Sequence, residues 1–572
     1  MWQALILFLK KYFLFVLFVL LGILANYALL HDGFFYLHDF THASRITEMS
    51  QALQEGQWPV RWSDNFGYGF GMPLFNFYAP LPYFFGAIFD LLGFEVITSI
   101  KLLYLLCNLI TMVMAFKFAR LWLGRLASVI VSGVYLLAPY RAVNLFVRGA
   151  MSEVFAMAFF PWVLWAAWSF IQSRQKKYLL HLVLALAAIV LSHNLSALMF
   201  IPLSFALAAS YLLYQKKIAL IWPILSSYVL AFTLTAFYSL PSFLEKDFTQ
   251  IYKIFAGYFH YSHHFLYIRQ FFKENWQYGG SAWGPDDGIS FFLGAAALLA
   301  IAALALFVLR QRKTFFRNKE LLFWMIASTI ALGASLFLTL LRSQWLWDRV
   351  SLLQYIQFPW RFLSIASLFL AILSGLSVQL ASRFPKRLVY FILLLALLTY
   401  QSKYFKPAEY LDNPQALYYD DPQRIQDHMS EILPDYIPRQ MAEEKILKEY
   451  ADHDLLWVEQ GDLLIKNEIM IDRAAEKLVL VNLKEDALLS LKIAAFPGWQ
   501  IEVDGEQQEN LVDPNLGNLQ VRVTQGEHKV GAIFTQNTWP RQLGNTLSAA
   551  SLLLMLYLFF PFDRSGRNKS TK

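Results

Sequence analysis

Long apolar runs recur along most of this 572-residue chain. A helix needs about 20 consecutive apolar residues to cross the hydrocarbon core of a bilayer. About twelve runs approach that length: residues 12–30, 95–116, 125–141, 152–171, 178–193, 195–214, 218–240, 289–309, 320–341, 359–381, 387–402 and 543–562. The pattern predicts a polytopic α-helical membrane protein.

One further apolar run, residues 73–93, is ambiguous by length alone. Three prolines interrupt its first half, and its aromatic residues suit a membrane–water interface. If this run does not span, the other lysine and arginine clusters and the basic tail (564–572) fall on the side of Lys10 and Lys11. Positive residues accumulate in cytoplasmic loops. We therefore expect cytoplasmic N- and C-termini, and a helix at 73–93 that lies along the outer face.

This topology leaves three large pieces outside the cytoplasm: residues 31–95, 241–288 and 403–543. In the first piece, residues 41–55 show the period of an amphipathic helix. Its apolar stripe consists of Ala43, Ile46, Met49 and Leu53. Its polar face consists of Arg45, Glu48, Gln51 and Glu55, with His42 at the edge. Gly56 and Pro59 are expected to end the helix.

The third piece changes composition along its length. Residues 403–475 are charged and mixed, whereas short alternating runs with turn residues between them follow. These runs predict an antiparallel β domain with strands at 477–483, 488–496, 499–503, 519–523 and 529–534. We therefore divide the chain into a transmembrane domain (1–402), an extracytoplasmic mixed and β domain (403–542), and a last transmembrane helix with a cytoplasmic basic tail (543–572).

Composition supports the membrane assignment, because 57% of the residues are hydrophobic and only 16% are charged. The net charge of +7 is spread over short clusters between apolar runs, so we expect no nucleic-acid partner. The single cysteine, Cys107, excludes a disulfide framework and a CxxC metal site. No small-residue cleavage site follows the first apolar run, which we interpret as a retained signal anchor.

Ionisable residues concentrate just beyond that first run, where residues 38–45 have the sequence HDFTHASR. Charged groups near a membrane are costly and are therefore functional candidates. Asp39 is the first candidate for a catalytic carboxylate, and the alternative is that it caps the helix that begins about two residues later. His42 and Arg45 lie one helical turn apart. They either orient an anionic group or form a solvated polar face.

Further polar residues lie at the predicted outer ends of spans: Arg148, Glu153, His193, Asn194, Glu245 and Arg361. Arginines at this depth suit a phosphate group, because they are always charged and make bidentate contacts. The alternatives are an Arg148–Glu153 ion pair and an Arg361 that snorkels to the headgroups. His193 and Asn194 could instead form a buried hydrogen-bonded pair. Glu245 could line a cavity or be an exposed loop acid.

Several motifs together resemble a known family. HDFTHASRITEMSQALQEGQWPVRW (38–62) and NFGYGFGMPLFNFYAPLPY (65–83) resemble bacterial membrane proteins labelled "6-pyruvoyl-tetrahydropterin synthase-related". The resemblance continues through RGAMSE (148–153), LSHNLSAL (191–198), LPSFLEK (240–246) and FPWRFL (358–363). AFPGWQIEVDGE (495–506) and GEHKVGAIF (526–534) resemble the C-terminal β domain of bacterial membrane glycosylation proteins. The layout of the first loop is similar to that of GT-C membrane glycosyltransferases.

The resemblance implies a fold of GT-C type and an inverting glycosyl transfer, with Asp39 activating or orienting the acceptor hydroxyl. The expected substrate-binding residues are His38, His42, Arg45, Arg148, Glu153, His193, Asn194, Glu245 and Arg361. Asp39 and His42 could share a divalent cation, but a metal site would need more ligands, so metal dependence stays open.

The outward-facing position of these residues bears on the sugar donor. Nucleotide sugars are generally cytoplasmic, and the sequence has no phosphate-cradling glycine-rich loop followed by lysine. We therefore expect a polyprenyl-phosphate-linked sugar, an extracytoplasmic acceptor of unknown identity, and a place in the bacterial inner membrane. Two other functions stay open: a transporter or flippase of lipid-linked glycans, and a non-catalytic assembly protein of envelope glycan synthesis. The transferase hypothesis predicts that Asp39, His193 and Arg361 line one outer-facing cleft.

Overall fold

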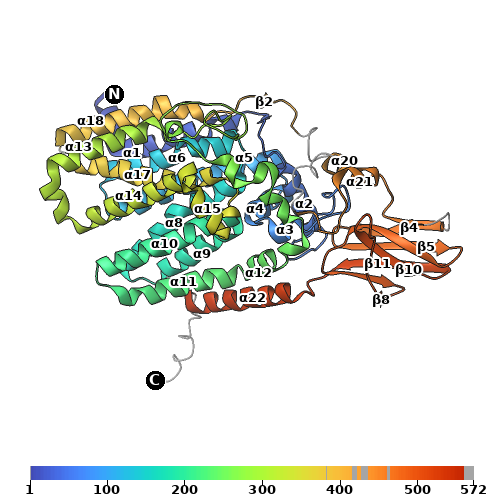
Figure 1. The fold of residues 1–572 in the computed structure, drawn as a ribbon. Coiled ribbons are helices and arrows are strands. Elements are labelled where there is room, and N and C mark those ends of the chain that lie inside the picture. The colour runs from blue at the N-terminus through green and yellow to red at the C-terminus, as the bar shows by residue number, and fades with distance from the viewer. Residues whose placement is uncertain (1, 382, 415–421, 427–435, 460–463, 560–572) are drawn as a thin grey trace, which may run out of the picture.

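The computed structural model describes residues 2–381, 383–414, 422–426, 436–459 and 464–559. Apolar helices occupy one end of the molecule and two antiparallel sheets occupy the other (Figure 1). The main helices are α1 (Trp2–Asn26), α5 (Val96–Arg120), α6 (Arg125–Leu136), α7 (Pro139–Phe146), α8 (Met151–Ser173), α9 (Lys177–Ser192), α10 (Asn194–Tyr214), α11 (Ile221–Leu234), α12 (Ala236–Leu244), α13 (Ala295–Arg317), α14 (Lys319–Thr339), α17 (Leu363–Leu380), α18 (Arg383–Leu395) and α22 (Trp539–Phe559). Short helices α15 (Gln344–Arg349) and α16 (Ser351–Gln354) precede α17.

Within the described residues, seven helices are long and apolar enough to cross a membrane. Helices α11 and α12 would form an eighth span if this pair, bent by 69°, crosses as one. Three expected spans appear as helices with shorter apolar stretches: Phe15–Leu30, Lys177–Ser192 and Ala295–Leu309. The expected span at 387–402 is divided between α18 and a π-helical turn at Ala396–Gln401. The helical membrane architecture is thus confirmed, whereas the count of twelve is not. Residues 560–572, with the predicted basic tail, lie outside the described residues.

The first loop forms three helices between the apolar helices and the sheets: α2 (His42–Gln54), α3 (Leu74–Phe77) and α4 (Leu81–Leu91). Helix α2 confirms the amphipathic pattern, and its apolar stripe packs on α4. A side chain at Gly86 would lie 2.6 Å from Ile46, so glycine permits this close packing. The run at 73–93 is broken, because the chain leaves the helical conformation at Tyr78 before α4 begins.

The predicted polar face of α2 is wrong in one respect, because Arg45 and Glu48 are buried within the protein. The Glu48 carboxylate accepts hydrogen bonds from the Ser63 hydroxyl at 2.6 Å and from the backbone N–H groups of Asp64 and Asn65 at 3.0 and 3.1 Å. Burial raises the pKa of Glu48, although these hydrogen bonds oppose the shift. Glu48 therefore holds the turn that follows α2 instead of facing solvent.

The C-terminal sheets confirm the predicted β domain. One sheet has the order β3–β6–β10–β9 and the other β4–β5–β11–β7–β8. The strands are β3 (Leu456–Val458), β4 (Leu464–Arg473), β5 (Glu476–Leu483), β6 (Ala487–Ala494), β7 (Trp499–Val503), β8 (Glu506–Gln508), β9 (Leu511–Val512), β10 (Asn518–Val523) and β11 (Gly526–Phe534). Strand β5 alternates strictly between buried and half-buried residues, as expected for successive side chains on opposite faces of a strand.

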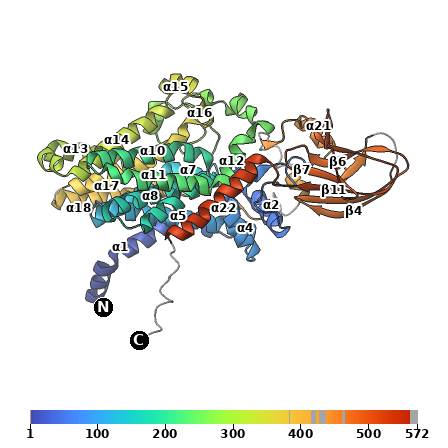
Figure 2. The ribbon, with the colours of Figure 1, turned by 90° about the horizontal axis from the view of Figure 1, so that it is seen from below.

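The β domain is joined to the rest of the molecule at several places. Trp62 of the first loop packs against Trp499 and Phe534, with ring centroids 5.2 and 5.1 Å apart. A short ladder pairs β1 (Phe34–Phe35) with β2 (Tyr410–Leu411). After the last strand, α22 runs back along α11 and α12 (Figure 2). The first loop is therefore held between the helices and the C-terminal part.

Candidate functional site

A cavity of about 800 Å³ lies where the first loop meets the ends of the apolar helices. Seven of the predicted site residues line it: His38, Asp39, Arg45, Arg148, His193, Asn194 and Arg361. The cavity has the size of a typical pocket for a small ligand. Asp39, His193 and Arg361 come from segments far apart in the sequence, and the structure brings them to one cavity as the transferase hypothesis requires.

Backbone hydrogen bonds fix the position of Asp39. The His38 and Asp39 N–H groups donate to the Val147 and Arg148 carbonyls at 3.1 and 2.8 Å. The His38 ring donates from Nε2 to the Tyr278 carbonyl at 2.9 Å. The residue that caps α2 is Thr41, so the alternative role of Asp39 as a helix cap is wrong. The Asp39 side chain is 32% exposed and therefore open to the cavity.

The Asp39 carboxylate has three close partners. It accepts a hydrogen bond from the Thr41 hydroxyl at 2.7 Å and lies 3.6 Å from both the Arg45 guanidinium and the His42 ring. Burial raises the pKa of Asp39. The opposite effects of His42, Arg45, Thr41 and Arg148 are together larger, so the net pKa lies below the ordinary value. Asp39 is therefore ionised at neutral pH, as a carboxylate that orients a hydroxyl and accepts its proton must be.

A buried carboxylate, Glu153, lies between Arg148 and Arg361. Glu153 is 1% exposed, and its Oε2 lies 2.9 Å from Nη1 of Arg148 and 3.9 Å from Nε of Arg361. Tyr140 donates to its other oxygen at 2.6 Å. Glu153 thus lies behind the arginines and does not line the cavity. The predicted Arg148–Glu153 pair is present, and Arg361 joins it.

The cavity keeps an excess of positive charge. One carboxylate, Glu153, serves two guanidinium groups, and the Nε of Arg361 is buried without a hydrogen-bond partner among the described residues. Arg148 also lies over the Trp360 ring, with 4.4 Å from the guanidinium carbon to the ring centre. Lys246, a residue that the sequence did not single out, lines the same cavity. Such a site attracts an anion, and guanidinium groups suit phosphate oxygens.

His193 offers a neutral donor beside these cations. Its Nδ1 accepts the Ser196 N–H at 3.3 Å, which caps α10. Burial lowers the pKa of His193 to about 3, and Arg361 and Arg148 lower it too, although Glu153 opposes them. We assign the remaining proton to Nε2, because Nδ1 accepts. The Asn194 side chain forms hydrogen bonds with other residues: it donates to the Phe77 carbonyl at 3.2 Å and accepts from the Tyr238 hydroxyl at 2.5 Å.

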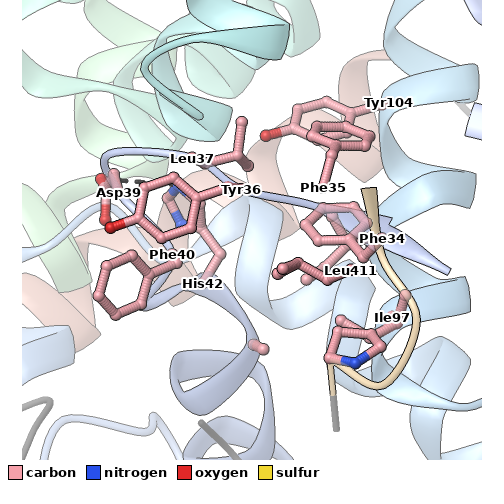
Figure 3. A pocket seen from close by; sticks show the side chains of 13 residues that line it. Phe34, Phe35, Tyr36, Leu37, Asp39, Phe40, His42, Ile97, Tyr104 and Leu411 are labelled. Carbon is pink, nitrogen blue, oxygen red and sulfur yellow. Dashed lines mark ion pairs between the residues drawn. The ribbon is translucent and has the colours of Figure 1, made fainter. Parts of the chain in front are cut away.

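Besides Glu153, two predicted site residues, His42 and Glu245, lie outside the cavity. His42 is buried, with Nδ1 2.9 Å from the Tyr83 hydroxyl and Nε2 against the Gly149 carbonyl. With Asp39 it lines a separate hollow of about 30 Å³, which is too small for a sugar. Figure 3 shows this hollow, with Asp39 and His42 toward one end and Phe34 and Ile97 toward the other.

Glu245 corrects a second expectation. It is neither a cavity residue nor an exposed loop acid, because it is 2% exposed and its Oε2 accepts from Nε and Nη2 of Arg541 at 3.1 Å each. Asn76 donates to the same oxygen at 2.8 Å. Glu245 therefore fixes α22 to the first loop. Its partner lies 296 residues away, so no local pattern could have identified the contact.

The geometry of Asp39 and His42 gives little support to a metal site between them. Both ring nitrogens of His42 already have partners, as described above. Among the residues that the structure describes, no group of three or more His, Cys, Asp or Glu side chains converges as metal ligands would. The His42 ring lies 3.6 Å from the Asp39 carboxylate, but its low pKa of about 4 makes it neutral at neutral pH, and both of its nitrogens are engaged, so the two residues do not form a preformed pair of metal ligands.

Another part of the cavity is lined by apolar side chains. Its lining there comes from α9, α10, α11, α12 and α16: Val190, Leu195, Ala197, Leu198, Ile201, Pro202, Phe232, Phe243 and Leu352. Phe232, Phe243 and Leu352 also remain exposed at 49%, 64% and 55%. The cavity therefore combines cationic side chains with an apolar arm, defined by these residues, that reaches the surface at Phe232, Phe243 and Leu352.

These features define the class of the protein. It is a helical membrane protein with a cavity suited to an amphipathic anion. It belongs to the membrane-protein family described as the 6-pyruvoyl-tetrahydropterin synthase related domain, because the family model matches residues 75–407, more than half of the chain. The predicted family is thus confirmed, and the match includes the motifs at 148–153, 191–198, 240–246 and 358–363.

More distant similarities extend over parts of other proteins. An uncharacterized protein of Lactococcus lactis subsp. cremoris (strain MG1363) is 25% identical over 198 residues, which cover 34% of this chain and 32% of that protein. The chain therefore spans about a third of that relative. The cryo-EM structure of the arabinofuranosyltransferase AftD from Mycobacteria has 15% identity and a TM-score of 0.44, covering 71% of this chain and 28% of that one. The Archaeoglobus fulgidus oligosaccharyltransferase in its apo form has 13% identity and a TM-score of 0.42, covering 70% and 57%.

Proposed function

We propose that this protein is a membrane glycosyltransferase that moves a sugar from a polyprenyl-phosphate donor to an extracytoplasmic acceptor. One observation carries the proposal: a single cavity holds an ionised carboxylate, an excess of cations and an apolar arm that reaches the surface. A polyprenyl phosphate sugar has the matching parts, namely an isoprenoid tail, an anionic phosphate and a sugar. The layout of the first loop, which resembles that of GT-C transferases, supports the same function.

The proposed reaction assigns a role to each end of the cavity. Asp39 orients an acceptor hydroxyl and takes its proton as the oxygen attacks the anomeric carbon. The bond from that carbon to the donor phosphate oxygen breaks, and the electron pair leaves with the phosphate. Arg148 and Arg361 stabilise the charge that develops on this leaving group. The Nε2–H of His193 can donate to the same anion. The apolar arm would hold the isoprenoid tail.

The proposal includes a place for the reaction. We infer a bacterial plasma membrane in which both termini face the cytoplasm, because the basic clusters of the sequence fall on that side. The first loop, the cavity and the β domain would then face outward. The acceptor would reach Asp39 from that side, while the donor lipid enters from the bilayer.

The test separates chemistry from lipid binding. Purified protein in nanodiscs is incubated with a set of synthetic undecaprenyl-phosphate sugars, and released undecaprenyl phosphate is measured by mass spectrometry. We expect Asp39→Asn to lower turnover at least about a hundredfold, the usual contribution of a general base. Binding of undecaprenyl phosphate should persist in this variant and weaken in Arg361→Gln. Turnover by Asp39→Asn at the wild-type rate would remove the carboxylate from the reaction. Transport of the intact donor without turnover would indicate a flippase.

A further inference from the structure

One wall of the cavity consists of aromatic rings and begins next to Asp39. The Arg45 guanidinium, 3.6 Å from Asp39, lies over the Tyr78 ring at 4.3 Å from its centre. Tyr78 meets Tyr436 edge to face, with ring centroids 6.0 Å apart. Tyr436 is nearly parallel to Phe77 at 6.2 Å. All four side chains line the cavity, so the wall is continuous from the carboxylate to Tyr436.

Tyr436 belongs to the C-terminal part of the chain and not to the apolar helices. Its segment is fixed by backbone hydrogen bonds from Gln250 to the Ile437 carbonyl at 3.0 Å and from Arg439 to the Phe248 carbonyl at 2.7 Å. The Gln250 side chain also donates to the Met441 carbonyl at 3.1 Å. The C-terminal part thus supplies a residue of the cavity from a defined position.

The donor phosphate and its tail do not require this wall. The cations at Glu153 and the apolar arm between the helices already match them. Tyr78 and Tyr436 are half-buried, so part of each ring faces the cavity. Aromatic side chains combine an apolar face with a polar hydroxyl in the tyrosines. A sugar ring has the complementary surface, because its C–H groups pack on the ring face and its hydroxyls form hydrogen bonds.

We propose that Phe77, Tyr78 and Tyr436 form the subsite for the sugar ring of a glycan acceptor, next to Asp39. This inference rests on the proposed function, which requires an acceptor hydroxyl at Asp39. It adds that the acceptor is a glycan and that the C-terminal part of the chain takes part in recognising it. Tyr436 determines acceptor affinity here, and it is not a catalytic residue.

The experiment measures sugar binding without the donor. Full-length protein in nanodiscs is titrated with a panel of methyl α- and β-glycosides of hexoses and pentoses, and binding is followed by saturation-transfer NMR. We expect at least one glycoside to bind. Tyr436→Ala should weaken it about tenfold, because the packing of a sugar on the ring is lost. Tyr436→Phe should stay within about threefold, because the ring face is kept. Tyr252→Ala is the matched control, since Tyr252 is exposed in the same region and does not line the cavity.

The result can be distinguished from a failure of the proposed function. Undecaprenyl phosphate binding is measured on the same samples, and Tyr436→Ala should leave it unchanged. Equal glycoside affinity in the wild type and Tyr436→Ala would overturn the subsite, and so would a wild type that binds no glycoside of the panel. Loss of undecaprenyl phosphate binding in Tyr436→Ala would also overturn it, because the residue would then serve the donor or the fold.

Discussion

Replacing Glu153 with glutamine tests the electrostatic design of the cavity. This carboxylate lies between Arg148 and Arg361 at 2.9 and 3.9 Å, and it is almost completely buried. At about 4 Å, two opposite unit charges attract by about 4 kcal/mol at an effective dielectric constant of about 20. Removing one member of a buried ion pair typically costs about 3–5 kcal/mol. A glutamine keeps one acceptor oxygen for Arg148, and its amide NH2 can donate to the Tyr140 hydroxyl oxygen, so we expect about 3 kcal/mol for Glu153→Gln.

The same substitution should strengthen the binding of an anion. Without Glu153, two guanidinium groups lack their shared counter-charge, and a phosphate in the cavity would supply it. A tenfold gain in affinity corresponds to about 1.4 kcal/mol. The variant should therefore unfold at lower temperature than the wild type when alone, yet gain more stability from added undecaprenyl phosphate.

Intrinsic-fluorescence melting in nanodiscs, with and without undecaprenyl phosphate, measures both effects. Glu320→Gln is the control, because the Glu320 carboxylate accepts a hydrogen bond from Tyr211 at 3.3 Å and contacts no arginine among the side chains that the structure describes. Equal stabilisation of wild type and Glu153→Gln by the lipid phosphate would show that the cavity cations do not hold it. Unchanged stability of the free variant would refute the magnitude of the buried pair.

Two further predictions concern stability. Burial lowers the pKa of His42 to about 4, below its ordinary value of 6.5. The unfolded chain therefore binds a proton that the folded chain does not, so stability should fall as the pH drops from 6.5 toward 4, by about 3 kcal/mol at pH 4.5. In His42→Gln, the melting temperature should change less with pH over this range than in the wild type. An equal change in both proteins would contradict the low pKa assigned to His42. Glu245→Gln should cost about 3–5 kcal/mol by leaving the buried Arg541 without its counter-charge. Glu444→Gln, which removes an exposed pair with Lys448, should cost under about 1 kcal/mol in the same melting assay. Equal losses would refute the structural role of Glu245.

Local patterns identified most secondary structure because they record burial directly. In β7, Trp499 and Ile501 are buried whereas Gln500 and Glu502 are half-buried, and this alternation is visible in the sequence. The period of α2 was visible for the same reason. The burial of its polar face was not, because Glu48 contacts a turn whose position depends on the fold.

In the candidate site, too, some residues could be identified from the sequence and others only from the fold. The sequence indicated Asp39 and Arg361 because ionisable residues near apolar runs are rare. It did not indicate Lys246 or Tyr436, whose residue types are ordinary in loops and which acquire meaning only by lining the cavity. It also misplaced Glu245, because the contact with Arg541 is made by the last helix. Composition and periodicity describe what each segment buries, whereas partners distant in sequence come from the fold.

The geometry of Asp39 depends on segments from across the chain. Its backbone pairs with residues 147–148, its neighbour His38 contacts Tyr278, and β1 of the same loop pairs with β2 at residues 410–411. A catalytic group must be held within a fraction of an ångström to be effective, and supporting contacts provide that rigidity. The boundary at residue 402 therefore separates stretches of different composition but not separate functions. The C-terminal part holds the loop that carries the carboxylate, and Tyr436 faces the same cavity, so we expect catalysis to require both parts.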